Sequence, residues 1–326
     1  MSLIQINNLK MAFGGQDIFD SLCASINRGN HIGLVGPNGV GKTTLLRLMI
    51  GELESLSGTI TKQPDTAIGY LPQHPAYLPG TTLYDEVYSG LGEIKEVARE
   101  MKMLEKKLND PSPSENVGIE QEAIKYSELV DHFQLMGGNR AKSRISSMLS
   151  GLGVPERIWD SPMDSLSGGE RNMIGLAKIL IGKHNLLLLD EPGNHLDFSG
   201  LEWLENFLNG SDKAFIIVSH NRYMLDQVCR NIWELERGIL TEYSGNYSEY
   251  RRKKLSRQLV QAAAYRRAQH DIDRLQFNIQ RLKSWASVYD NPKLARTAKV
   301  FEKRVEDLKK IEKPKGDGKN MKFQFL

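Results

Sequence analysis

The stretch Gly36-Pro37-Asn38-Gly39-Val40-Gly41-Lys42-Thr43 fits the pattern GxxxxGK[ST], and the apolar residues 32–35 before it predict a strand. Successive backbone N–H groups in such a glycine-rich turn, with the positive end of the following helix, form a concavity that suits the phosphates of a nucleotide. We expect Lys42 to reach the β- and γ-phosphates and the Thr43 hydroxyl to bind Mg²⁺. The stretch therefore predicts a phosphate-binding loop between a buried strand and a helix.

The composition is that of an ordinary globular protein. The chain has 326 residues, of which 40% are hydrophobic, and this is enough for one large domain or two smaller ones. No apolar run reaches the roughly 18 residues of a bilayer-spanning helix, and the N-terminus lacks the features of a signal peptide. The two cysteines, Cys23 and Cys229, have no metal-ligand spacing, so we expect reduced packing residues. These features predict a soluble protein of the cytoplasm.

The net charge of +3 hides an uneven distribution of charge along the chain. Residues 250–315 contain 19 Lys or Arg and 7 Asp or Glu, whereas residues 1–249 have a net charge of −10. Such asymmetry is typical of proteins whose basic part binds a polyanion. The alternative is a solvated, charged helix without a partner.

The hydrophobic pattern predicts an α/β fold with a mixed sheet. Short apolar or alternating runs predict strands at residues 3–6, 22–26, 31–35, 59–60, 67–71, 186–189 and 215–218. A helix is expected from Lys42 to Ile50, because Gly51 is well suited to end it. Charged segments with regularly spaced Leu and Met predict a mainly helical insertion at about residues 82–165.

The basic region has the periodicity of a helical hairpin. Apolar residues recur at spacings of three and four in two series: Ile272, Leu275, Ile279, Leu282 and Ala286, then Leu294, Ala298, Phe301, Val305 and Leu308. Asp290-Asn291-Pro292 has strong turn chemistry and separates the two series. A first arm over residues 247–288 would be about 60 Å long at 1.5 Å per residue. Residues 313–320 are rich in Lys and Gly and predict a flexible connection.

A second motif supplies two carboxylates. The apolar run at residues 186–189 ends in Asp190 and Glu191. Asp190 at the tip of a strand can hold Mg²⁺, directly or through water, and Glu191 can orient and polarise an attacking water molecule. The alternative is that this pair merely caps the next helix.

A third motif, Leu166-Ser167-Gly168-Gly169-Glu170, precedes a helical run. Its serine hydroxyl and backbone amides lie at the positive end of that helix and form a second potential phosphate site. Because one small site cannot be filled twice, we expect this patch to close over a nucleotide held by another domain. The alternative is an ordinary N-terminal helix cap.

The order of these motifs, with Gln73, Asn194-His195-Leu196-Asp197 and His220, resembles an ATP-binding cassette (ABC) domain of the P-loop NTPase class. The resemblance covers residues 1–245 and implies ATP and Mg²⁺ as cofactors. It implies that Gln73 senses the γ-phosphate and the metal, that His220 contacts the γ-phosphate, and that residues 194–197 line the seam with a second cassette. The implied nucleotide-binding residues are Phe13, Gly36, Pro37, Asn38, Gly39, Gly41, Lys42, Thr43 and Thr44. On sequence alone, Phe13 and His220 could instead be packing residues.

Two features resemble the F subfamily of ABC proteins: the Asn-His-Leu-Asp form of the seam loop, and a basic hairpin of about 70 residues after the cassette. Members of that subfamily contain two cassettes joined by such a linker, lack a membrane domain and act on the ribosome near its tRNA sites. The resemblance implies a cassette at residues 1–245, a linker at 246–315 and the start of a missing second cassette at 316–326. The chain departs from the family pattern at Gly193, where Thr is usual, and at Met173, where a basic residue is common.

The expected turn of the hairpin combines basic and aromatic residues. The candidate RNA contacts are Arg281, Lys283, Trp285, Lys293, Arg296 and Lys299, with Tyr289 nearby. Basic side chains neutralise phosphates, and aromatic rings stack on unpaired bases. The alternative is that Trp285 and Tyr289 hold the hairpin together while the lysines keep it soluble.

Together with these observations, the resemblance implies a cytosolic ATPase that closes on ATP, with a second cassette or a second copy of the chain, and positions the hairpin on rRNA or tRNA of the ribosome. Translation control, protection against ribosome-targeting antibiotics and ribosome assembly all fit this interpretation. The ATPase subunit of a membrane transporter is an alternative that does not need the hairpin. A DNA-repair or chromosome ATPase is another, but in those proteins the coiled coil is inserted within the cassette.

Overall fold

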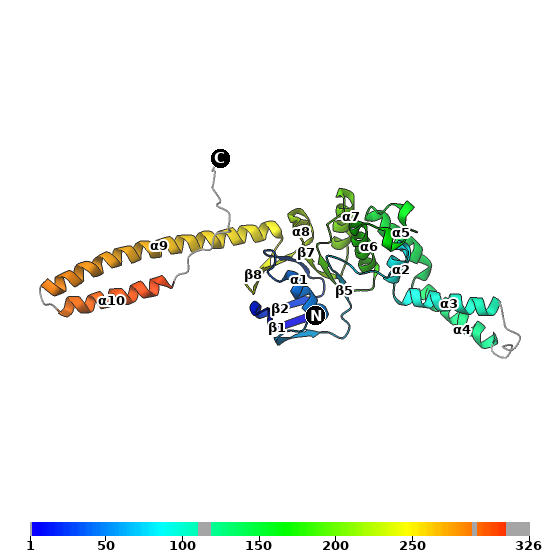
Figure 1. Ribbon diagram of the computed structural model, residues 1–326, viewed down its shortest axis with the longest axis horizontal. Helices are drawn as coiled ribbons and strands as arrows, with labels where there is room; N and C mark the ends of the chain where they lie inside the picture. Colours follow the sequence, from blue (N-terminus) through cyan, green and yellow to red (C-terminus); the bar gives the residue numbers. More distant parts are fainter. Residues whose placement is uncertain (1, 110–118, 289–291, 311–326) are drawn as a thin grey trace. The chain divides into compact units, whose positions relative to one another are not determined.

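The computed structural model describes residues 2–109, 119–288 and 292–310, which divide into two compact units, Met1–Ser248 and Glu249–Leu326. The first unit contains two β-sheets and a group of helices, and the second contains two long helices (Figure 1). Two expectations, the start of a second cassette at residues 316–326 and the flexible connection at 313–320, lie outside the described residues.

A six-stranded mixed sheet has the strand order β5-β6-β7-β3-β8-β9. Its strands are β3 (His31–Val35), β5 (Ile68–Leu71), β6 (Leu186–Asp190), β7 (Ala214–Val218), β8 (Asn231–Glu236) and β9 (Ile239–Ser244). Neighbouring strands are parallel except for β8 and β9, which are antiparallel. The carboxyl ends of β3, β7 and β6 therefore share one edge, where the phosphate loop and the two carboxylates meet.

A separate antiparallel sheet has the order β2-β1-β4. It consists of β1 (Ser2–Phe13), β2 (Gln16–Asn27) and β4 (Ser57–Lys62). The expectation that residues 3–6, 22–26 and 59–60 join the mixed sheet was therefore wrong. Gly14 and Gly15, at φ 57° and 83°, form a tight turn that pairs β1 with β2, so these strands satisfy each other's backbone groups.

The helices of the first unit lie between and after these strands. They are α1 (Lys42–Ile50), α2 (Leu83–Ser89), α3 (Glu93–Asn109), α4 (Ile119–Leu135), α5 (Ala141–Gly151), α6 (Gly168–Ile181), α7 (Phe198–Asn209) and α8 (Arg222–Val228), with short 3₁₀ turns at Gly138–Arg140, Glu156–Ile158 and Met163–Ser165. Helix α1 has the predicted bounds and ends at Gly51, whose φ is 87°. The segment from α2 to the last 3₁₀ turn is the helical insertion.

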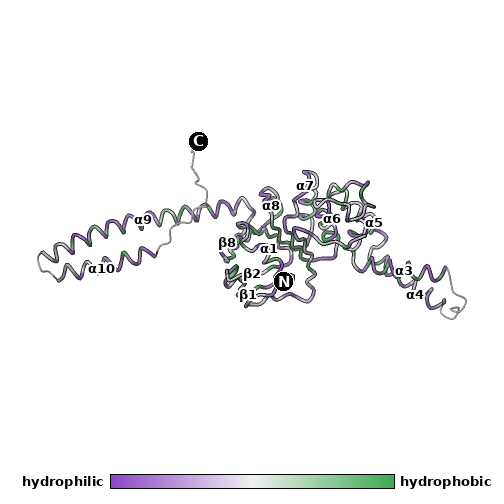
Figure 2. The backbone as a smooth tube through the Cα atoms, viewed as in Figure 1, coloured by the Kyte–Doolittle hydropathy of each residue, from purple (hydrophilic) through white to green (hydrophobic). Residues whose placement is uncertain are grey.

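Apolar side chains from both sheets and from α1 form one buried cluster. Leu34 of β3, Leu45 of α1, Leu188 of β6 and Ile6 of β1 belong to it. Strands β6 and β7 are buried along their whole length, as continuous apolar runs predict for central parallel strands. Figure 2 shows this hydrophobic centre in green, with more hydrophilic backbone around it.

His31, the first residue of β3, gives the fold an acid-sensitive position. The imidazole is only 3% exposed, stacks on Phe215 with ring centroids 4.3 Å apart, and has no hydrogen-bond partner for Nδ1 among the described residues. Burial, followed by the charge of Arg230, lowers the pKa of His31 below 6.5. Below about pH 6.5, His31 therefore binds a proton more readily in the unfolded chain than in the folded one.

We therefore expect the free energy of unfolding to fall as the pH drops below about 6.5. His31→Gln should have a shallower acid limb in urea denaturation measured between pH 5 and 7.5. His74→Gln, an exposed position, is the matched control and should follow the wild type. Identical slopes for His31→Gln and wild type would show that His31 does not titrate on unfolding.

The second unit contains the predicted hairpin. Its helices are α9 (Tyr247–Val288), which begins in the first unit, and α10 (Pro292–Lys309). Both lie side by side in Figure 1 and bury a small apolar core of Ile272, Leu275, Ile279 and Val305, with Phe301 and Leu308 against it. These are residues of the two predicted apolar series, so the antiparallel helical hairpin is confirmed. Within residues 2–109, 119–288 and 292–310, no helix is long and apolar enough to span a bilayer.

Candidate functional site

A cavity of about 440 Å³ lies at the carboxyl ends of the central strands. It brings together most of the residues that the sequence predicted for a nucleotide: Asn38, Gly39, Gly41, Lys42, Thr43, Thr44, Gln73, Asp190, Glu191, Asn194 and His220. Ile18 of β2 and Val218 of β7 also line it and were not predicted, because an apolar residue at a strand end has no distinctive sequence signal. Thr43 and Asp190, which are 147 positions apart in the sequence, therefore lie in the same site.

The phosphate loop has the geometry of an anion cradle. Gly39 and Gly41 adopt φ values of 76° and 104°, a region that L-residues with side chains avoid. At Gly41 a Cβ atom would lie 2.5 Å from the Ile18 side chain, so no other residue fits without a shift. Gly41 also precedes α1, whose N-terminal amides have no side-chain cap among the described residues. Those amides can donate to a phosphate.

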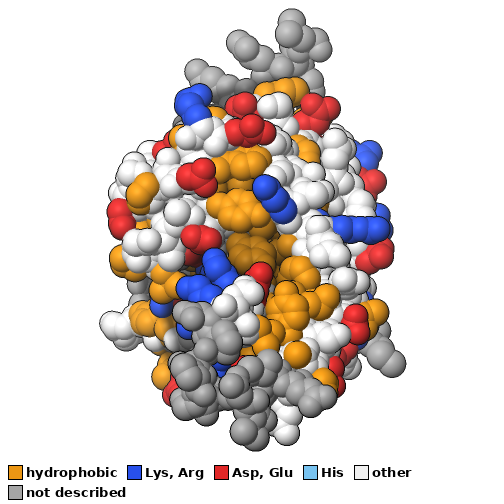
Figure 3. Space-filling model, turned by 90° about the vertical axis from the view of Figure 1, so that its right-hand side faces the viewer, with side chains coloured by type: hydrophobic (Ala, Val, Ile, Leu, Met, Phe, Trp, Pro, Cys, Tyr) orange, Lys and Arg blue, Asp and Glu red, His pale blue; other side chains and the backbone are white. Residues whose placement is uncertain are grey.

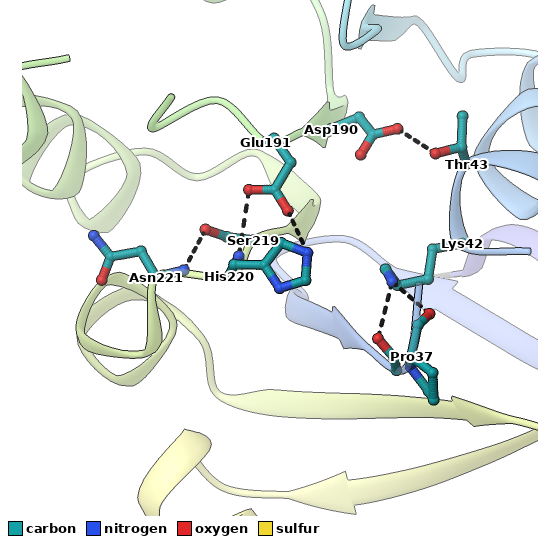
Figure 4. Close-up of polar contacts among 9 residues, drawn as sticks. Pro37, Lys42, Thr43, Asp190, Glu191, Ser219, His220 and Asn221 are labelled. Atoms are coloured by element: carbon teal, nitrogen blue, oxygen red, sulfur yellow. Dashed lines mark hydrogen bonds and ion pairs between the residues drawn. The ribbon is translucent and has the colours of Figure 1, made fainter. Parts of the chain in front are cut away.

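Lys42 is folded back over the loop (Figure 4). Its Nζ donates to the carbonyl oxygens of Gly36 and Pro37, both at 2.9 Å. Burial lowers the pKa of Lys42, and the carboxylates of Glu191 and Asp190 oppose that shift. A triphosphate would give this ammonium stronger partners than two carbonyl groups.

Thr43 and Asp190 offer a site that fits Mg²⁺. The Thr43 hydroxyl donates to Oδ2 of Asp190 at 2.6 Å, while the buried Oδ1 of Asp190 has no hydrogen-bond partner among the described residues. Burial raises the pKa of Asp190, and the Thr43 hydrogen bond and Lys42 oppose the shift. A fully buried carboxylate with an unused oxygen beside a hydroxyl is the donor set that a hard cation requires. The residues therefore fit the metal that the motif implies.

Glu191 is held in a strained conformation at the end of β6. Its φ of 56° lies in the left-handed region, which non-glycine residues occupy mainly at functional sites. Its Oε2 accepts the backbone N–H of His220 at 3.3 Å, and its Oε1 lies 3.5 Å from Nε2 of the same residue (Figure 4). Burial raises the pKa of Glu191, and the hydrogen bond from His220 opposes the shift. A carboxylate with a raised pKa that faces a cavity can act as a base.

The Leu-Ser-Gly-Gly-Glu motif is not among the residues that line this cavity, and its role toward another domain stays a prediction. Ser167 caps α6 in a capping box: its Oγ donates to Oε2 of Glu170 at 2.7 Å and accepts the Glu170 N–H at 3.3 Å. These hydrogen bonds lower the pKa of Glu170. In this structure Ser167 and Glu170 therefore act as a helix cap, which was the alternative interpretation of the motif.

The seam loop contacts the signature motif within the same chain. His195 has a φ of 73°, and a Cβ atom on Gly169 would lie 3.1 Å from its ring. Asp197 caps α7, because its Oδ1 accepts the Gly200 N–H at 2.8 Å, while Leu196 is half-buried. Among residues 194–197, only Asn194 lines the cavity. His195 therefore packs against the signature motif and Asp197 caps a helix, in addition to the role that the resemblance implies.

Three further predicted positions do not line the cavity: Phe13, Gly36 and Pro37. Phe13 ends β1 and is 48% exposed. A Cβ atom on Gly36 would lie 2.2 Å from the Leu235 carbonyl oxygen, so this glycine allows the loop to approach β8. Gly36 therefore supports the loop, and its contact with nucleotide stays a prediction.

The candidate RNA contacts belong to the hairpin unit. The side chains of Arg281, Lys283, Lys293, Arg296 and Lys299 are exposed. Lys283 pairs with Glu302 at 2.7 Å and thereby links α9 to α10. Trp285 lies in α9, but its side chain and the whole of Tyr289 fall outside the described residues, so the choice between stapling and stacking stays a prediction.

The model of the ABC transporter family matches residues 19–194, and a second model with the same description matches residues 233–325. The chain belongs to the ABC transporter family. This ABC chain contains an ABC ATPase domain, and its relatives confirm the predicted resemblance to the F subfamily. The second match covers the whole of the hairpin, which the first does not reach.

Three curated relatives show the range of similarity. The ABC chain is 34% identical over 325 residues to the ATP-binding protein YdiF of Bacillus subtilis (strain 168), which covers 100% of this chain and 49% of YdiF. It is 32% identical over 331 residues to ABC transporter F family member 5 of Arabidopsis thaliana, with 99% and 46% covered. It is 34% identical over 254 residues to the energy-dependent translational throttle protein EttA of Escherichia coli (strain K12), with 77% and 45% covered. The chain thus spans about half the length of the curated relatives it matches.

The fold is that of ABC ATP-binding subunits. The ATP-binding subunit of an ABC transporter superposes with a TM-score of 0.54 at 18% identity, covering 77% of this chain and 92% of that one. At this identity the likeness establishes the architecture alone.

Proposed function

We propose that this ABC protein binds and hydrolyses ATP with Mg²⁺, and that it acts as an F-subfamily translation factor on the ribosome in the cytoplasm. The observation that carries the proposal is the combination of a nucleotide cavity with a long basic hairpin, Tyr247–Lys309, in one chain. The name of EttA, a translational throttle, supports the same conclusion. Regulation of translation and protection from antibiotics that target the ribosome are both compatible with this role.

The residues of the cavity divide the work of phosphoryl transfer. The loop amides and Lys42 hold the phosphates, and Thr43 and Asp190 hold Mg²⁺, with Gln73 as a further ligand. The metal supplies charge neutralisation when bound. Glu191 orients the attacking water and accepts its proton, and His220, next to Glu191, reports the presence of the γ-phosphate. Phe13 is exposed at the end of β1, where its ring can stack on adenine.

Closure needs a second cassette. The start of α6, with Ser167, Gly168, Gly169 and Glu170, lies outside the cavity of its own chain and is proposed to complete the site of an opposing cassette. The opposing cassette belongs to the complete protein, or to a second copy of this chain. Asn194, His195, Leu196 and Asp197 line the seam. ATP binding then shifts the population toward the closed state, and hydrolysis returns it to the open state.

The hairpin is the proposed RNA-binding element. Residues 250–315 contain 19 Lys or Arg and only 7 Asp or Glu. The face seen in Figure 3 instead shows a band of hydrophobic side chains bordered by both acidic and basic ones. Lysine and arginine side chains on a hairpin release counterions when they bind RNA phosphates. Among the candidates, Arg296 and Lys299 lie one turn apart on α10, and both are exposed. They can therefore contact neighbouring phosphates.

We expect the double substitution Arg296→Gln/Lys299→Gln to weaken ribosome binding and to reduce its salt dependence. Each lost phosphate contact should lower the slope of log K against log salt by about one, so the slope should fall by about two. Filter binding to purified ribosomes between 50 and 200 mM KCl measures this. Lys102→Gln/Lys106→Gln on α3 removes the same charge and should leave the slope unchanged. Equal slopes in the hairpin variant and wild type would contradict the assignment.

The overall proposal is tested by sedimentation with ribosomes. Glu191→Gln in the complete protein should co-migrate with ribosomes in the presence of ATP and separate from them without it, because the closed state then persists. The same protein should not pellet with membrane vesicles. Retention by vesicles but not by ribosomes would favour the ATPase subunit of a transporter instead.

A further inference from the structure

A pair of hydrogen bonds joins α8 to the first turn of α9. Asp226 lies on α8, and its Oδ1 accepts the backbone N–H of Ser248 at 2.7 Å, while its Oδ2 accepts the Ser248 hydroxyl at 3.0 Å. Ser248 is the second residue of α9, so its N–H is one of the amides that cannot pair within the helix. A carboxylate at the positive end of a helix also interacts favourably with the helix dipole. The start of α9 is therefore fixed by a side chain from another element.

The other end of α8 lies at the nucleotide cavity. The helix begins directly after His220 and Asn221, and Asn221 caps it by accepting the Met224 N–H at 3.2 Å. His220 in turn donates its backbone N–H to Glu191. Asp226 is six positions after His220, and the part of α8 from Arg222 to Asp226 rises roughly 6 Å. One short element thus connects the proposed γ-phosphate sensor with the beginning of the hairpin.

Helix α8 is tightly packed, so we expect it to move as a rigid body. Met224, Leu225 and Val228 are at most 1% exposed. A Cβ atom on Gly193 would lie 3.5 Å from Sδ of Met224, so the segment after Glu191 also packs against this helix. A displacement of either Glu191 or His220 is therefore transmitted to the whole of α8 rather than absorbed within it.

We propose that Asp226 is a positioning residue that transmits the nucleotide state of the cavity, through α8, to the first turn of α9. This inference rests on the proposed function, because it explains how ATP directs the hairpin. The pair of hydrogen bonds to Ser248 is the element with two states: it either carries α9 along with α8 or breaks and frees the first turn. Helix α9 has 42 residues, so a tilt of about 5° at its start moves its far end by about 5 Å.

The test measures hydrogen exchange at α9 in the complete protein. Amide exchange in a peptide covering residues 247–255 is followed with and without a non-hydrolysable ATP analogue and Mg²⁺. In the wild type we expect the analogue to change this exchange about tenfold, the size of effect that a helix cap can control. Asp226→Ala should bind the analogue within about twofold of wild-type affinity, yet lose the nucleotide-dependent change.

Two further variants separate coupling from simple capping. Asp226→Asn retains an acceptor for the Ser248 N–H and should restore part of the response. Asp212→Ala removes an exposed carboxylate before β7 and should behave as wild type. If Asp226→Ala exchanges faster overall but keeps the full nucleotide-dependent change, the contact is only a cap and the inference is overturned.

Ribosome sedimentation of the same samples distinguishes this inference from the proposed function. ATP-dependent ribosome binding in a wild type whose α9 does not respond to nucleotide would overturn the inference and leave the function standing. An α9 response that depends on Asp226 in a protein that never binds ribosomes would support the inference and refute the proposed function.

Discussion

Glu191→Gln is expected to lower ATP turnover by about 10²- to 10³-fold, because a positioned general base typically contributes that much. The amide has nearly the same shape and can still accept the His220 N–H through its oxygen, but it cannot take a proton from water. ATP affinity should remain within about threefold of wild type, since we assign the phosphate contacts to the loop and Lys42 and not to Glu191. Phosphate release under single-turnover conditions measures the chemical step directly.

The melting temperature of the same variant provides a test of its folding. Burial raises the pKa of Glu191, so the ionised carboxylate is disfavoured in the folded protein at neutral pH. The glutamine variant should therefore melt at a higher temperature than the nucleotide-free wild type at pH 7.5. The gain should shrink as the pH falls through the raised pKa toward the ordinary value of 4.5, because Glu191 itself becomes neutral.

Glu105→Gln is the matched control for this experiment. Glu105 is an exposed residue of α3, away from the cavity, so the same chemical change there should alter neither turnover nor melting. Turnover of Glu191→Gln within about threefold of wild type would mean that another group activates the water.

Lys42→Met is expected to raise the dissociation constant for ATP by about 10- to 100-fold. Hydrogen bonds to charged groups are each worth about 1.5–3 kcal/mol, and among the described residues that line the cavity there is no other Lys or Arg to replace the ammonium. The methionine retains the length and apolar body of the side chain. Because burial already lowers the pKa of Lys42, removing the charge should not destabilise the nucleotide-free fold.

Equilibrium titration with a fluorescent ATP analogue measures this affinity. Lys142→Met on the exposed surface of α5 removes the same charge and should bind as wild type. Unchanged affinity in Lys42→Met would show that Lys42 keeps its hydrogen bonds to Gly36 and Pro37 when nucleotide binds.

Local signals in the sequence predicted those parts of the fold that local chemistry decides. Helix α1 begins and ends where predicted, because a glycine stands at each end, and Gly51 adopts the left-handed conformation that stops a helix. The hairpin core follows the predicted apolar series, because a 3.6-residue period leaves few alternatives. The convergence of Lys42, Thr43, Asp190 and Glu191 follows from parallel strands that end at one edge.

The sequence pattern did not predict which distant elements pair with each other. Strands β1, β2 and β4 have alternating residues that suit either sheet, and only their mutual register shows that they form their own. Nothing in the sequence around Asp226 or Ser248 marks them as partners 22 residues apart. The capping box of Ser167 was recognisable as an alternative, yet its choice over an open phosphate site depends on where the Glu170 side chain lies.

That capping box makes Glu170 a built-in competitor. Its carboxylate occupies the Ser167 hydroxyl and the Ser167 N–H, at 2.7 and 2.8 Å, so the beginning of α6 already has an anion of its own. In the closed state that we propose, a phosphate presented by an opposing cassette competes with this carboxylate, so the apparent affinity of the two halves is scaled by the fraction of molecules in which the box is open. Closure would therefore need a higher nucleotide concentration than it would with an uncapped Ser167.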